Sequence, residues 1–226
     1  MAEKICVVIP AFKEAARIGA VVRAVRAQAL DVVVVDDGSP DATAAEAATA
    51  GAQVLRHADN RGKGAAIGTA FQFARERDYT IVITMDGDGQ HDPADLPALL
   101  SAQQQTDAAV VVGNRMAASA AMPLVRRWTN RGMSCLLSCC MGQLVPDTQC
   151  GFRLYRVAVL PCQSLHSARY AAESEMLLEL AQRGVRITSV PVRTIYSDEK
   201  SKINPVIDTV RFFGMMLRHA VRRKRG

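Results

Sequence analysis

Two patterns of hydrophobic and polar positions alternate along the first half of the chain. Uninterrupted apolar, mostly β-branched runs are typical of strands buried on both faces of a parallel sheet, and they predict strands at 5–9, 32–35, 53–55, 79–85 and 108–112. Between them apolar residues recur at helical spacing, first at Ile18, Val21, Val22 and Val25. Strands that alternate with helices predict an α/β protein with a doubly wound, mainly parallel, Rossmann-like sheet and helices on both faces.

The pattern changes after about residue 115. Met133, Leu136, Leu137, Cys140, Met141 and Leu144 form a helical stripe inside an uncharged stretch, 133–145. A polar, glycine-containing segment at 147–156 follows, then a helix at 173–182, a strand at 187–192 and a final helix with Val206, Val210, Phe213 and Leu217 on one face. We expect one catalytic domain, 1–200, and an extension, 201–226, that forms an amphipathic helix with a basic tail.

Charge is concentrated at the end of the chain. The net charge of the 226 residues is +6, and five of these charges come from Arg218, Arg222, Arg223, Lys224 and Arg225. Such a patch suits anionic lipid or RNA. Because the chain lacks the aromatic side chains on which RNA bases usually stack, we expect no nucleic-acid partner.

The composition also indicates in which compartment we expect the protein. No run of 18 or more uncharged apolar residues occurs, and the N-terminus enters a strand at once, so we expect neither a transmembrane helix nor a signal peptide. The six cysteines form no C-x-x-C pair, and we interpret them as reduced, buried residues of a cytoplasmic protein.

Polar residues gather where the predicted strands end, after Ile9, Val35, Leu55 and Met85. Ligands of doubly wound sheets bind at these carboxyl ends. The strongest cluster is Asp86-Gly-Asp88-Gly-Gln90, which offers two carboxylates and an amide oxygen to a hard cation, Mg²⁺ or Mn²⁺. Turn formation alone would also explain Asp and Gly here. His91 is expected to be an ordinary loop residue rather than a ligand.

A glycine-rich loop at 60–67 exposes backbone amides at a helix start, where phosphates bind. It is not a Walker motif, since Ala65 stands where Ser or Thr is needed, and it lacks the G-x-G-x-x-G spacing. ATPase and dehydrogenase functions therefore lose their main support.

Six ordered motifs, VVIPAFKEA, VVVVDDGSPDAT, NRGKGAAI, MDGDGQHDP, GNR and DTQCGFRLYR, resemble the family 2 glycosyltransferases over residues 4–200. Within that family the likeness is to the polyprenyl-phosphate (dolichyl-phosphate) mannosyl- and glucosyltransferase branch. The resemblance implies a GT-A fold, a nucleotide-sugar donor of the GDP-mannose or UDP-glucose type, a divalent metal and inversion at the sugar carbon.

Matched position by position, the resemblance assigns roles to individual residues. The nucleotide pocket would comprise Pro10, Phe12, Glu14, Asp37, Lys63 and Asp86, with Asp37 on the base and Lys63 near the base and ribose. The metal ligands would be Asp86, Asp88 and Gln90. The acceptor phosphate would meet Arg115, Arg126, Arg131 and Arg153, although Arg153 could instead brace Asp147. Asp88, Asp147 and Arg115 are the residues expected to act in catalysis.

Two kinds of acceptor remain open. Phosphate is already ionised at neutral pH and needs cationic side chains to hold it, whereas a hydroxyl needs a carboxylate base such as Asp147, Glu173 or Glu175. We expect a polyprenyl phosphate acceptor and peripheral attachment to the inner face of the membrane; a homodimer is compatible with the sequence. The alternatives are transfer to a hydroxyl of a soluble or saccharide acceptor, and a non-catalytic nucleotide-binding module on membrane or RNA.

Overall fold

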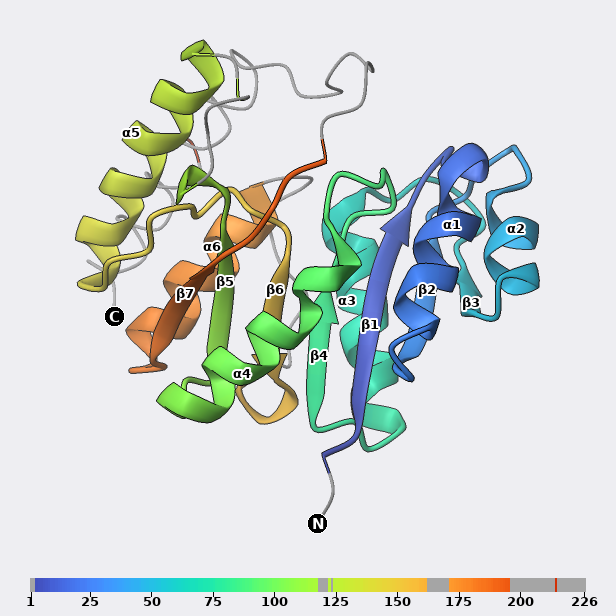
Figure 1. The fold of residues 1–226 in the computed structure, drawn as a ribbon, viewed down its shortest axis with the longest axis horizontal. Coiled ribbons are helices and arrows are strands. Elements are labelled where there is room, and N and C mark those ends of the chain that lie inside the picture. Colours follow the sequence, from blue (N-terminus) through green and yellow to red (C-terminus); the bar gives the residue numbers. More distant parts are fainter. Residues whose placement is uncertain (1–2, 118–121, 123, 162–170, 196–213, 215–226) are drawn as a thin grey trace.

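Seven strands form one sheet in the order β3-β2-β1-β4-β6-β5-β7. The computed structural model describes residues 3–117, 122, 124–161, 171–195 and 214 (Figure 1). Its strands are β1 (Ile5–Ala11), β2 (Asp31–Asp36), β3 (Gln53–Arg56), β4 (Ile81–Thr84), β5 (Val110–Asn114), β6 (Arg153–Arg156) and β7 (Ile187–Pro191). Its helices are α1 (Ala15–Arg26), α2 (Thr43–Thr49), α3 (Lys63–Glu76), α4 (Leu96–Thr106), α5 (Leu124–Met141) and α6 (Ala171–Gln182), with short 3₁₀ turns η1 (Pro93–Asp95) and η3 (Val157–Val159).

The pairing confirms the predicted mainly parallel, Rossmann-like sheet. β1 pairs in parallel with β2 and β4, β2 with β3, and β5 with β7. The cores of β1, β2, β4 and β5 are buried because helices cover both faces: Figure 1 shows α4 crossing in front of the strands while α3 and α6 lie behind them. The carboxyl ends of β1, β2 and β4 therefore meet at one edge, as the clustering of polar residues predicted.

Strand β6 is the main departure from the predicted fold. It lies between β4 and β5 and is antiparallel to both. Its sequence, Arg-Leu-Tyr-Arg, contains no apolar run, so the sequence predicts only a polar, glycine-containing segment at 147–156 and no strand. Leu154 and Tyr155 are nevertheless fully buried, and so is Arg153, whose guanidinium is satisfied by hydrogen bonds rather than by water.

The uncharged stripe at 133–145 belongs to α5 and its C-terminal turn, and it divides between two environments. Leu137, Met141 and Val145 are buried, whereas Leu136 and Leu144 are exposed. The expectation that the cysteines are buried is correct for Cys6 and Cys150 and wrong for three others: Cys135, Cys139 and Cys140 lie on the exposed side of α5.

Within the described residues, no helix has the length and apolar character needed to cross a bilayer. The extension 201–226, with its predicted amphipathic helix and basic tail, and Cys162 fall almost entirely outside the described residues, so the domain boundary at 200 stays a prediction.

Candidate active site

The acidic loop begins directly after β4 and bends sharply. Gly89 has a φ of +75°, which favours glycine, whereas a Cβ atom added at Gly87 would only meet Ile9 and Ile18 at 3.4 Å, an ordinary contact distance. The Asp88 carboxylate accepts a hydrogen bond from the Gln90 backbone amide at 2.9 Å. Burial and, secondarily, the neighbouring Asp86 raise the pKa of Asp88. The loop thus holds two like charges that a cation would stabilise.

Lys63 supplies a positive charge to this loop from the first residue of α3. Its Nζ lies 2.5 Å from Asp86 Oδ1 and 3.2 Å from Glu173 Oε2. Burial alone would raise the pKa of Asp86, but Lys63, followed by His91, outweighs burial and lowers it to about 2. The resemblance placed Lys63 near base and ribose; in this structure its ammonium lies instead between two carboxylates.

Gly151 lies against this cluster, where a larger residue would not fit. A Cβ at this position would lie 3.0 Å from Asp86 Oδ2, 3.0 Å from Lys63 Nζ and 3.2 Å from Glu173 Oε1. The Gly151 carbonyl accepts a hydrogen bond from Thr84 Oγ1 at 2.8 Å, which ties it to β4. The sequence contained this glycine within a family motif but gave no sign that it contacts the acidic loop.

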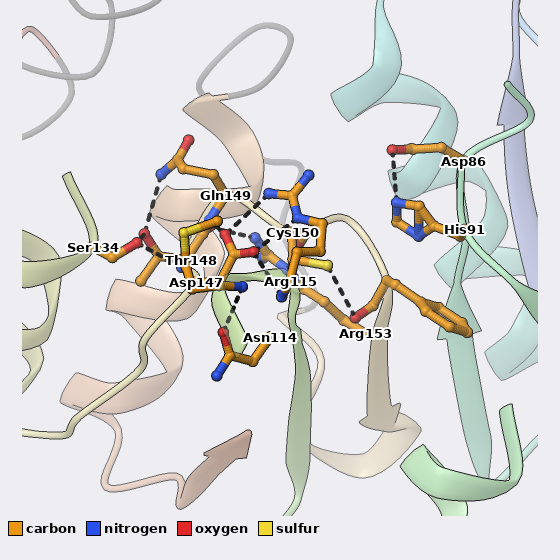
Figure 2. A network of polar contacts seen from close by, with 12 residues as sticks. Asp86, His91, Asn114, Arg115, Ser134, Asp147, Thr148, Gln149, Cys150 and Arg153 are labelled. Carbon is orange, nitrogen blue, oxygen red and sulfur yellow. Dashed lines mark hydrogen bonds and ion pairs between the residues drawn. The ribbon is translucent and has the colours of Figure 1, made fainter. Parts of the chain in front are cut away.

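His91 is not the ordinary loop residue that we expected. It is buried, and its Nε2 lies 3.5 Å from Asp86 Oδ2 (Figure 2). Its ring packs on Phe152 with centroids 5.2 Å apart. Burial is the main cause that lowers the pKa of His91, to about 4, so the ring is neutral at physiological pH. At that pH His91 therefore lies beside Asp86 as an uncharged ring, and it adds positive charge there only when it is protonated.

The oxygen atoms of the acidic loop suit a divalent cation that binds together with a phosphate-containing ligand. Among the described residues, no group of three or more His, Cys, Asp and Glu side chains has the arrangement of a metal site. Asp86, Asp88 and Gln90 nevertheless supply hard oxygen donors from one loop. Mg²⁺ is commonly held by one or two carboxylates together with substrate phosphates, so this set fits a metal delivered with a diphosphate.

Arg115 and Asp147 form a second cluster, drawn in Figure 2. The guanidinium donates from Nε to Asp147 Oδ2 at 2.8 Å and from Nη2 to Oδ1 at 3.0 Å, and the Arg115 backbone amide also donates to Oδ2. Asp147 is fully buried and Arg115 is 8% exposed. Arg115 is also near enough for its charge to lower the pKa of Asp86, so the two clusters share one electrostatic environment.

Arg153 takes a different place from either one we expected. Its guanidinium donates to the backbone carbonyls of Cys150, Glu173 and Thr148 at 2.6, 2.7 and 2.8 Å, and it is fully buried. It contacts no carboxylate of Asp147 in these hydrogen bonds. The assignment of Arg153 to the acceptor phosphate is therefore corrected: it fixes the loop before β6 that carries Gly151.

The arginines of α5 divide between two sides of the helix. Arg126 is half-buried and Arg131 is exposed; being five residues apart, they differ in direction by about 140°. The buried side carries Ser134, whose hydroxyl lies 3.1 Å from Thr148 Oγ1, next to Asp147. Arg127 lies two turns from Ser134 on that side, and its buried Nε has no hydrogen-bond partner among the described residues. Arg127 was not among the predicted site residues, because only its position around the helix distinguishes it from Arg126.

The residues expected to bind the nucleotide lie where β1 and β2 end. Pro10 pairs with Val35, Phe12 is exposed on the loop that follows, and Glu14 is buried before α1. Asp37 accepts hydrogen bonds from the backbone amides of residues 61 and 62 at 2.9 and 2.7 Å and contacts the His57 ring. Asp37 thus shapes the loop at the start of α3, and its contact with a base stays a prediction.

The model of the family described as "Glycosyl transferase family 2" matches residues 6–162. The UDP-N-acetylglucosamine–dolichyl-phosphate N-acetylglucosaminyltransferase of Methanococcus voltae is 31% identical over 88% of this chain and 88% of its own length. The undecaprenyl-phosphate mannosyltransferase of Micrococcus luteus is 33% identical over 72% of this chain and 70% of its own.

Solved structures agree on the fold. Glucosyl-3-phosphoglycerate synthase from Mycobacterium tuberculosis, crystallised with Mn²⁺, UDP and glucosyl-3-phosphoglycerate, has a TM-score of 0.70 and 19% identity over 96% of this chain and 79% of that chain. The likeness confirms the GT-A type of α/β sheet. The family match spans more than half of the sequence, and the relatives confirm the resemblance to the polyprenyl-phosphate branch: the chain belongs to glycosyl transferase family 2.

Proposed function

We propose that this protein is a metal-dependent, inverting hexosyltransferase. It moves a hexose from a nucleotide sugar of the GDP-mannose or UDP-glucose type to a polyprenyl phosphate at the cytosolic face of a membrane. The names of the relatives support the acceptor class, since both act on a polyprenyl-type phosphate. Their donors differ, so the sugar of this protein is left to experiment.

The observation that carries the proposal is the ion pair between Arg115 and Asp147. A general base needs a carboxylate that can take up a proton, and both oxygens of Asp147 already accept from the Arg115 guanidinium. The pair instead holds a cationic guanidinium in one orientation near the acidic loop. Such a group suits a phosphate acceptor, which requires positive charge and no base.

In the proposed reaction, an oxygen of the ionised acceptor phosphate attacks the anomeric carbon of the sugar. The bond from that carbon to the donor diphosphate breaks, and the nucleoside diphosphate leaves with the bonding electron pair. Attack from the opposite face inverts the configuration. Arg115 orients the attacking phosphate, and Arg127, with Arg126 beside it, extends the cationic surface from α5.

Asp86, Asp88 and Gln90 would hold Mg²⁺ or Mn²⁺, which supplies charge stabilisation to the departing diphosphate when bound. Lys63 adds a further positive charge beside Asp86. Pro10, Phe12, Glu14 and Asp37 would form the wall of the nucleotide pocket.

One observation favours a second candidate, transfer to a hydroxyl acceptor. Glu173 is buried, and while its Oε2 contacts Lys63, its Oε1 has no hydrogen-bond partner among the described residues. A carboxylate oxygen in that state could accept a proton from a hydroxyl. Glu173→Gln separates the two candidates, because it abolishes base catalysis but leaves attack by an ionised phosphate in place.

A donor screen tests the proposal. Purified protein with Mn²⁺ or Mg²⁺ receives labelled UDP-glucose, GDP-mannose or UDP-N-acetylglucosamine and a polyprenyl phosphate in detergent, and label is counted in the organic phase. Asp88→Asn removes a proposed metal ligand. Its matched control is Asp92→Asn, which removes the same charge four residues later from a side chain that caps η1 and pairs with Arg193.

We expect label in the lipid with one donor, lost with chelator and in Asp88→Asn but retained in Asp92→Asn and Glu173→Gln. Label that appears only in a soluble saccharide, and disappears in Glu173→Gln, would replace the lipid-phosphate acceptor by a hydroxyl. Metal-dependent nucleotide binding without any product would favour the non-catalytic alternative.

A further inference from the structure

The outward face of α5 is apolar although it is exposed. Leu124, Val125 and Trp128 are 62%, 72% and 66% exposed, Leu136 is 37% exposed, and Leu144 in the following turn is 83% exposed. Cys135, Cys139 and Cys140 are exposed on the same helix. We call this set of side chains the outer face of α5. Contiguous apolar surface of this kind marks a docking site more often than it marks ordinary solvent exposure.

The charges of α5 are all of one sign. Between Leu124 and Met141 the sequence has Arg126, Arg127 and Arg131 and no acidic residue. Arg131 is the exposed one and borders the outer face. A second copy of this helix would bring arginine towards arginine with no carboxylate on either helix to compensate, whereas an anionic lipid surface complements them.

The opposite side of the same helix reaches the candidate active site. Ser134 Oγ accepts a hydrogen bond from the Thr148 amide at 2.9 Å, and Asp147, the partner of Arg115, is the preceding residue. Apolar contact and acceptor-phosphate binding would therefore occur on two sides of one helix. A polyprenyl phosphate has this same division, with its chain in the bilayer and its phosphate at the surface.

We propose that the outer face of α5 docks on an anionic bilayer and presents the active site to phosphates at its surface. The apolar side chains enter the boundary between headgroups and acyl chains, where tryptophan is favoured, and Arg131 lies at the level of the lipid phosphates. This inference rests on the proposed function for the identity of the acceptor, but docking itself is measured without any substrate.

Trp128 provides the probe, because it is the only tryptophan in the chain. The full-length protein is mixed with vesicles of phosphatidylglycerol or of phosphatidylcholine, and tryptophan emission is recorded. A parallel series contains lipids brominated in the acyl chains, which quench tryptophan only at short range. We expect a blue shift and quenching with phosphatidylglycerol and little of either with phosphatidylcholine.

Two variants keep Trp128 as the reporter. Val125→Glu/Leu136→Glu places negative charge on the outer face, at positions that are 72% and 37% exposed. Ala45→Glu/Ala48→Glu adds the same charge to exposed positions of α2, at the far end of the molecule from α5 in Figure 1. We expect the first variant to partition into phosphatidylglycerol at least about tenfold more weakly and the second to behave as the wild type.

Three results would overturn the docking proposal. Flotation with vesicles without any change in Trp128 emission would assign binding to the basic end of the chain. Emission that is already blue-shifted without lipid and varies with protein concentration would assign the outer face to a second copy. Quenching that persists in Val125→Glu/Leu136→Glu would show that these side chains do not form the contact.

The docking proposal and the proposed function fail separately. Transfer of sugar to a short-chain, water-soluble polyprenyl phosphate without quenching of Trp128 would refute docking and leave the function intact. Quenching by brominated lipid without any lipid-linked product would support docking and refute the acceptor.

Discussion

Replacing Gly151 by alanine would place a methyl group among the charged side chains of the acidic loop. The new Cβ would lie 3.0 Å from Asp86 Oδ2 and from Lys63 Nζ, and 3.2 Å from Glu173 Oε1, all closer than ordinary van der Waals contact. The backbone cannot retreat freely, because Thr84 Oγ1 holds the Gly151 carbonyl at 2.8 Å. The three side chains must therefore move instead.

The expected effect is large on function and small on stability. The atoms that must move are the ends of side chains, so we expect at most about 1–3 kcal/mol from overpacking, partly offset by about 0.4–1 kcal/mol from the lower entropy of the unfolded chain. A displacement of about 1 Å in an active site lowers turnover on the order of 100-fold. We expect a folded protein that binds Mn²⁺ and nucleotide weakly and transfers sugar slowly.

Urea unfolding, calorimetric titration with Mn²⁺ and UDP or GDP, and initial rates measure these effects. The matched control is Gly68→Ala in α3, where an added Cβ meets no heavy atom within 4 Å. That change should leave activity intact and stabilise the protein by about 0.5–1 kcal/mol. A Gly151→Ala protein with wild-type nucleotide affinity and turnover would refute the assignment of this cluster to the donor site.

Three further substitutions test other parts of the site. Asp147→Asn removes one partner of a buried ion pair and should lower the free energy of unfolding, measured in urea, by up to about 3–5 kcal/mol. It should also raise the KM for the acceptor more than the KM for the donor. An unchanged free energy of unfolding would contradict the role of this ion pair. Arg153→Met removes the guanidinium that donates to three backbone carbonyls and should lower the free energy of unfolding by about 3 kcal/mol, measured in urea. A raised acceptor KM without loss of stability would return Arg153 to the acceptor site. In the wild type the pKa of Asp86 is about 2, and in metal-free Lys63→Met burial should raise it. The buried charge of Asp86 then destabilises the variant at neutral pH, and protonation on acidification relieves this cost. The difference in unfolding free energy between variant and wild type should therefore narrow as the pH falls from 7 towards 3, and a constant difference over that range would refute Lys63 as the main counter-charge.

The parallel half of the fold could be read from the sequence because each element there has a local signal. β1, β2 and β4 are apolar runs, and Ile18, Val22 and Val25 mark the buried face of α1. Strand β6 has no such signal. Its central place depends on hydrogen bonds that Arg153 makes with carbonyls before β6 and on α6, and no local pattern predicts that a charged residue will be fully buried.

In the candidate site, too, the sequence predicted the residues of one loop but not their contacts with distant segments. A spacing of two residues was enough to identify Asp86 and Asp88 as a pair, since one loop carries both. The neighbours of that pair come from distant segments: Lys63 from α3, Gly151 from the loop before β6 and Glu173 from α6. His91 is near in sequence, but its buried ring packs on Phe152, which comes from the loop before β6.

By itself the sequence determined the family, the mainly parallel sheet, the edge at which polar strand ends meet and the acidic loop, because these follow from residues close together in the chain. The tertiary structure decided which charges meet. It paired Asp147 with Arg115, placed Lys63 between Asp86 and Glu173, withdrew Arg153 into the core and set Trp128 on the outer face of α5. The physical reason is that a charge is compensated by whatever group the fold brings within a few ångströms, and only the packed chain fixes those distances.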